Sequence, residues 1–199
     1  MPGDHMKFRK RYEFKPDPGE QSILSQLWLT KKQRHTLLKW VLYSLLLLLL
    51  SLVQDVVLIR FPVMDATAEL MVSGMLVISL LQTPESGGIF TLIGSVLFFF
   101  SGSAPGAHSI VLLTFLSVLL NVLRHSLLSR RFRSVFVCAA AGVLIYEAAV
   151  FAIGLFLDQT HLARAGVFLT AALLGVATIP FVYPLAFFIG KIGGESWKD

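Results

Sequence analysis

Glu147 is the residue of this chain whose position most strongly suggests chemistry, because its carboxyl lies near the middle of an apolar stretch, residues 134–157. An unpaired charge at the centre of a membrane costs at least about 2.5–3.5 kcal/mol on insertion scales. We therefore expect Glu147 to face the interior of a helix bundle and to be neutral at pH 7. Two roles stay open: a carboxyl linked to a proton or a ligand, and a protonated side chain that hydrogen-bonds a neighbouring helix for packing alone.

A second group of polar residues interrupts an uncharged stretch, residues 86–123. Ser101, Ser103 and His108 lie in this break, and a serine near a histidine is the pairing that a hydrolase uses. No histidine follows in the last apolar stretch, 165–190, and the chain contains none of the motifs HExxH, GxSxG or GxGD. We therefore expect neither enzyme activity nor a bound cofactor.

Basic residues gather in the polar break that follows this stretch. They are Arg124, Arg130, Arg131 and Arg133. Such a cluster anchors a membrane protein on the cytosolic side, and it can also dock an acidic partner or lipid head groups. Both interpretations stay open.

The composition and the charge pattern place the chain in a membrane. Of its 199 residues 55% are hydrophobic and 15% are charged, whereas about a quarter are charged in a soluble domain. Nearly all Lys and Arg residues fall in alternate polar breaks, and these residues are retained on the cytoplasmic side during insertion. The pattern predicts an integral membrane protein with both ends in the cytosol. The net charge of +5 belongs to these breaks, so we expect no nucleic acid partner.

The predicted fold class is an all-α membrane bundle of about six transmembrane helices. The chain divides into a basic cytosolic tail, residues 1–36, a transmembrane domain, residues 37–192, and a second cytosolic tail, residues 193–199. The first tail contains a short amphipathic segment around Leu27 with basic residues behind it. That segment either lies on anionic lipid at the cytosolic face or is a linker with no further role. The single cysteine, Cys138, excludes a disulfide or a Cys-based metal site within the chain.

The apolar stretches predict helices at 37–58, 66–81, 134–157 and 165–190. Two arms of 15 residues each, 86–100 and 109–123, flank the polar break in the remaining stretch. A crossing needs about 17–25 residues, so the arms either cross as short helices or form a re-entrant hairpin. Six crossings is the better interpretation.

Two further local features follow from the physics of a membrane. Polar backbone at membrane depth is tolerated only when it is buried in protein or faces water, so the break around residues 101–108 is expected to point inward. Pro180 and Pro184 predict a kink or local unwinding in the second half of the last helix.

The order of these features resembles the rod shape-determining protein MreD family of bacterial cell elongation. The resemblance covers residues 37–192 and rests on Gln54, 65–70, Gly88, Gly94, 101–106, Pro180, Pro184 and Lys191. Asp65 opens the second helix in this pattern. The resemblance implies a non-enzymatic, multi-pass scaffold of the bacterial cell membrane that contacts the bitopic protein MreC. Through MreC it implies indirect contact with peptidoglycan synthases and with the actin-like protein MreB.

An alternative of another class is the substrate-binding subunit of an energy-coupling-factor vitamin transporter. These subunits have a similar length and six helices, and the MreD family resembles them in fold. They typically present small residues on the first helix to dock the coupling subunit. Here that helix is a run of leucines in which Ser44 and Ser51 are the small residues, which favours the scaffold.

Overall fold

The structure is a computed structural model that describes residues 31–60, 62, 66–127 and 132–192. The described residues form α-helices and short 3-10 helices, with no strand among them. The elements are α2 (Lys31–Val56), η2 (Leu58–Arg60), α3 (Leu70–Leu81), α4 (Pro84–Phe100), α5 (His108–Leu127), α6 (Phe132–Phe156), η3 (Leu162–Arg164) and α7 (Ala165–Ile192). The all-helical prediction is therefore confirmed for this part of the chain. The amphipathic segment around Leu27, Asp65, Arg130, Arg131 and the tail 193–199 lie outside the described residues.

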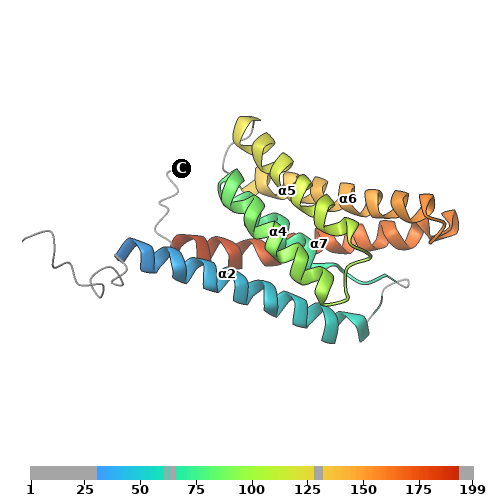
Figure 1. The fold of residues 1–199 in the computed structure, drawn as a ribbon, viewed down its shortest axis with the longest axis horizontal. Helices are drawn as coiled ribbons and strands as arrows, with labels where there is room; N and C mark the ends of the chain where they lie inside the picture. Colours follow the sequence, from blue (N-terminus) through green and yellow to red (C-terminus); the bar gives the residue numbers. More distant parts are fainter. Residues whose placement is uncertain (1–30, 61, 63–65, 128–131, 193–199) are drawn as a thin grey trace, which may run out of the picture.

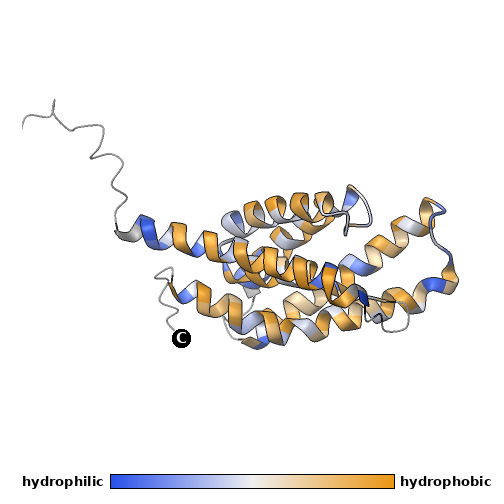
Figure 2. Cartoon of the chain, turned by 90° about the horizontal axis from the view of Figure 1, so that it is seen from below, coloured by the Kyte–Doolittle hydropathy of each residue, from blue (hydrophilic) through white to orange (hydrophobic). Residues whose placement is uncertain are grey.

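Four helices are long and apolar enough to cross a membrane, which indicates a membrane protein. They are Gln33–Val56, His108–Ser126, Phe132–Phe156 and Leu162–Ile192. Figure 2 shows hydrophobic residues along the helices, with hydrophilic residues mainly near the helix ends. The shorter helices, α3 and α4, have 12 and 17 residues, or about 18 Å and 26 Å at 1.5 Å per residue.

Some helices extend into the polar residues beside the apolar stretches and are therefore longer than those stretches predict. α4 begins at Pro84 and α5 continues to Leu127, so the two arms have 17 and 20 residues rather than 15. In contrast, the helix predicted from Ala66 begins only at Leu70. Residues Ala66 and Ala68 are buried in a non-helical segment, and this segment leads the chain into the bundle.

α3 is the centre of the bundle. Its sequence, LMVSGMLVISLL, is apolar all round apart from two serines, and every residue from Met71 to Leu81 is buried. A helix with no polar face must be enclosed, and α3 indeed contacts α2, α4, α5, α6 and α7. In Figure 1, α4 and α5 form a hairpin, and the start of α2 lies at the same end of the bundle as the end of α7.

α7 remains helical through its two prolines. Both Pro180 and Pro184 lie inside the continuous helix Ala165–Ile192, so the expected unwinding does not occur. Their rings are exposed on the outer surface of the bundle. Proline has no backbone N–H, so each of these residues lacks one helical hydrogen bond. Because both rings face outward, they do not disturb the side chains that α7 packs into the bundle.

Gly87 marks the closest approach between three helices. A Cβ at this position would lie 2.6 Å from Ser79 Oγ, 2.7 Å from the Ser79 carbonyl oxygen and 2.9 Å from Asn121 Nδ2. The carbonyl belongs to the backbone of α3 and cannot rotate away. The absence of a side chain at Gly87 therefore sets how closely α4 packs on α3 and α5.

We predict that Gly87→Ala destabilises the protein, because the added methyl group must push α4 away from α3. Overpacking of this kind typically costs about 1–3 kcal/mol. Thermal unfolding in detergent measures the effect. Gly166→Ala is the matched control, since nothing lies within 4 Å of a Cβ at Gly166. An unchanged midpoint for Gly87→Ala would contradict the packing described here.

Candidate functional site

Gln54 accepts a hydrogen bond from a backbone N–H at the start of the central helix, α3. Its side-chain Oε1 accepts a hydrogen bond of 3.0 Å from the Met71 backbone N–H, and the side chain is buried. The residue at the N-cap position, Glu69, makes no side-chain cap hydrogen bond. The first N–H groups of a helix have no partner within the helix, so Gln54 of α2 supplies one from outside.

The polar break between α4 and α5 lies against the end of α2. Ser103 Oγ donates a 2.8 Å hydrogen bond to Asp55 Oδ1, and Ser51 Oγ donates to Asp55 Oδ2 at 3.2 Å. Ser101 Oγ lies 3.1 Å from Ser103 Oγ. Gly102 has a φ of 76°, a conformation that glycine adopts without strain, and it completes the turn.

The expectation that this break points inward is wrong. Ser101 and Gly102 are exposed and Ser103 is half-buried. The reason is the length of the two arms, which carry the turn to the end of the bundle rather than leaving it at mid-depth. Ser103 donates its hydrogen bond to Asp55, and His108 Nε2 has no hydrogen-bond partner. We call this end of the bundle the Asp55 end.

Glu147 lies in the interior, as its position in the sequence predicts. It is 4% exposed, and its Oε1 atom has no hydrogen-bond partner. Tyr146 and Ser109 are also buried, and neither hydroxyl has a direct hydrogen bond. The fourth member, Glu69, is half-buried, with its Oε2 atom buried and unpartnered. These four residues, which we call the carboxyl cluster, come from the start of α3, the first turn of α5 and the middle of α6.

A separate polar network closes the opposite end, which we call the Lys39 end. The buried Lys39 Nζ donates to Gln82 Oε1 at 2.9 Å, and Gln82 Nε2 donates to Tyr43 OH at 3.0 Å. Asn121 Nδ2 donates to the Ser79 carbonyl at 2.7 Å. The network therefore joins α2 and α5 to the end of α3. The run of residues around Lys39 in the sequence carries no signal of its burial.

Arg124 does not belong to an exposed docking patch. It is 2% exposed, and its charge acts on Cys138 and on Tyr183 in the neighbouring helices. Arg124 lies one turn beyond the buried Asn121, on the same inward face of α5. Arg133 is exposed, and its predicted docking role, like that of Arg130 and Arg131, stays a prediction.

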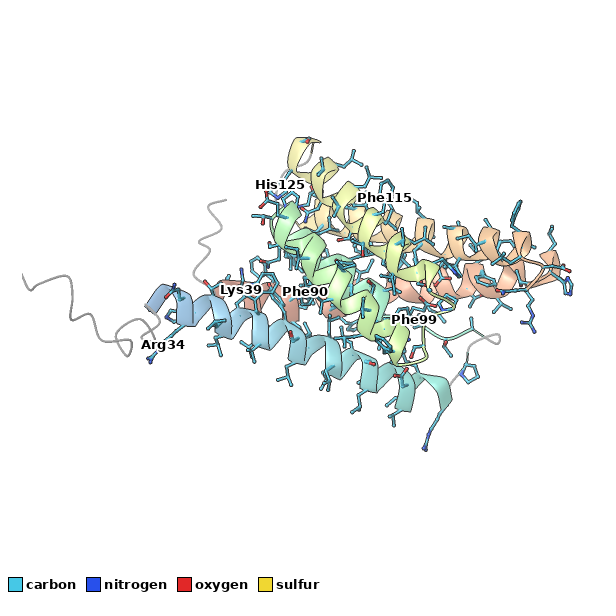
Figure 3. All side chains as sticks on the ribbon, in the orientation of Figure 1. Arg34, Lys39, Phe90, Phe99, Phe115 and His125 are labelled. Atoms are coloured by element: carbon cyan, nitrogen blue, oxygen red, sulfur yellow. The ribbon has the colours of Figure 1, made fainter. Side chains whose placement is uncertain are left out.

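A groove of about 530 Å³ lies between α2 and α4. Its lining is mostly apolar and consists of Trp40, Ser44, Leu47, Leu48, Ser51, Met71, Ser86, Ile89, Phe90, Ile93, Gly94 and Leu97. Phe90 closes the Lys39 end of this groove, since its ring centroid lies 5.8 Å from that of Trp40 and 6.0 Å from that of Tyr43. Figure 3 shows Phe90 near Lys39, and Phe99 farther along α4. Sequence analysis did not predict this groove.

The site has two chemical capacities. The groove offers apolar contact and small side chains, and the carboxyl cluster offers oxygen atoms. Among the described residues, no three His, Cys, Asp or Glu side chains gather as a metal site of that kind requires. Comparisons with protein-family models, curated proteins and solved structures find no match for this chain.

We predict that Gln54→Leu destabilises the protein by about 1–3 kcal/mol, the cost of a buried N–H left without a partner. Gln54→Glu is the matched comparison, because it retains an acceptor oxygen at nearly the same place. Thermal unfolding of both variants in detergent measures the difference. Equal midpoints for Gln54→Leu and the parent would show that Gln54 does not hold the start of α3.

Proposed function

We propose that this chain is a non-enzymatic membrane scaffold that holds the single transmembrane helix of a partner in the groove between α2 and α4. The groove is the observation that carries the proposal. α2 and α4 both pack on α3, and the face between them is open along the bundle. In a membrane such a face is covered by lipid or by another helix.

The lining of the groove fits a helix. On α4 the lining residues recur as Ser86, Ile89, Phe90, Ile93, Gly94 and Leu97, which is the spacing of one helix face. On α2 the small residues Ser44 and Ser51 lie two turns apart on the same face. Small residues let two helix backbones approach closely, and such positions are enriched where helices associate in membranes.

The resemblance to the MreD family suggests the identity of the partner. In that family the partner is MreC, a bitopic protein, which supplies one transmembrane helix. On this proposal the chain crosses the bacterial cell membrane six times with both ends in the cytosol, where its basic residues meet anionic lipids. MreC links it to peptidoglycan synthases and to MreB.

A substrate-binding subunit of an energy-coupling-factor transporter is the second candidate. The carboxyl cluster favours it, because buried oxygen atoms without partners are a feature of a ligand site. The two candidates differ in their partners: a scaffold has a bitopic morphogenesis protein, whereas a transport subunit has a coupling subunit and paired ATPases.

Affinity purification from native membranes in mild detergent, with mass spectrometry of the bound proteins, tests the proposal. We predict recovery of an MreC-like bitopic protein with the parent chain. Ser44→Phe fills the groove and is expected to reduce this recovery about tenfold, the equivalent of about 1.4 kcal/mol.

Leu45→Phe is the matched control, because Leu45 is exposed and does not line the groove. It should leave the recovery unchanged. Recovery of a coupling subunit with ATPases, or equal recovery with Ser44→Phe and the parent, would contradict the proposal.

A further inference from the structure

The carboxyl cluster lies apart from the groove and is not explained by the scaffold role. Ser109, Tyr146 and Glu147 are 0%, 1% and 4% exposed. Glu69 is half-buried at the start of α3, and its Oε2 atom is buried. Three different elements bring these residues together, because each belongs to a different helix or helix start.

Each member of the cluster has an oxygen atom that is buried and lacks a hydrogen bond. These atoms are Glu69 Oε2, Ser109 Oγ, Tyr146 OH and Glu147 Oε1. The Ser109 hydroxyl is close enough to act on the Tyr146 phenol, although the two oxygens do not form a direct hydrogen bond. Buried polar atoms in a native protein normally have a partner, so four such atoms in one place form a set of oxygens that suits a polar or charged group.

The charges of the cluster indicate what kind of group these oxygens suit. The charges of Glu69 and Glu147 act on each other, and both act on Tyr146. Neither carboxyl forms an ion pair with a Lys or Arg of the described part of the chain. Two neighbouring carboxylates in an apolar interior cannot both remain ionised without compensation. A positive charge must therefore accompany them.

The other packed elements do not supply that charge. α5 contributes His108, which directly precedes Ser109 and has a buried Nε2 without a partner. α2 contributes Asp55, which bonds to Ser51 and Ser103. α7 has no Asp, Glu, Lys, Arg or His between its start at Ala165 and Lys191.

We propose that Glu69 and Glu147 hold one monovalent cation between them, a proton or a sodium ion, with the hydroxyls of Tyr146 and Ser109 as further oxygen partners. Carboxylate and hydroxyl oxygens are ligands for hard cations. The proposal does not depend on the scaffold role, because no member of the cluster lines the groove.

The test is thermal unfolding of the purified full-length protein in nanodiscs, in sodium chloride and in choline chloride of equal ionic strength. If the cation is sodium, sodium chloride raises the midpoint on the order of 5 °C at about a hundredfold excess over its dissociation constant. If the cation is a proton, sodium has no specific effect, and the midpoint rises as the pH falls from about 8 to about 5. The sign follows because the folded state then binds more protons than the unfolded state.

Glu69→Gln and Glu147→Gln should each abolish a sodium effect, and each should weaken a pH effect, because one buried carboxyl remains in either variant. Glu85→Gln is the matched control, because Glu85 is exposed at the other end of α3, and it should retain the effect. Tyr146→Phe keeps the ring and removes one oxygen, so it should raise the sodium concentration at half-effect several-fold, or reduce the pH effect.

Tyr146→Phe also keeps the test decisive if a Gln variant fails to fold. The proposal is overturned if the parent responds neither to sodium nor to pH. It is equally overturned if the response of the parent is undiminished in the Gln variants, or in Tyr146→Phe when those do not fold.

Discussion

The structure depends on one constraint, the complete enclosure of α3. In a membrane there is no water to satisfy backbone groups, so each must find a partner within the protein. A helix that reaches the membrane–water interface can expose the unpaired backbone groups at its ends to water. α3 has only 12 residues, and its ends are covered by other helices. Gln54 supplies an acceptor at one end, and Asn121 supplies a donor at the other.

The enclosure of α3 determines where the other helices lie. α2, α4, α5, α6 and α7 all pack on it, so their mutual positions follow from its surface. Close approach requires a residue without a side chain at Gly87, where α3, α4 and α5 meet. The same arrangement leaves α2 and α4 on neighbouring sides of α3 with a groove between them. The proposed docking surface is therefore a consequence of how α3 is covered.

The sequence predicts local properties such as helix positions, but it does not predict the burial of residues that depends on contacts with distant parts of the chain. The apolar stretches were enough to place α6 and α7 within two residues of their observed bounds, because length and hydropathy are local properties. α2, in contrast, begins at Lys31, six residues before the predicted start. The start of α3 was predicted four residues early, at Ala66, whereas the helix begins at Leu70. The interior position of Glu147 followed from its polarity within an apolar stretch. The burial of Lys39 and Arg124 did not, because it depends on Gln82 and on helices distant in the sequence.

Cysteine cross-linking in native membranes tests the central claim, that the groove holds a partner helix, most directly. The only native cysteine, Cys138, is buried, and Cys138→Ala gives a background without a thiol. Ser44→Cys in that background, labelled with a thiol-reactive photo-cross-linker, places a cross-linking group in the groove, and Leu45→Cys, labelled in the same way, places one on the adjacent face. The account predicts a cross-link from position 44 to a protein with one transmembrane helix, and none from position 45. Equal cross-linking from both positions, or none from position 44, would contradict it.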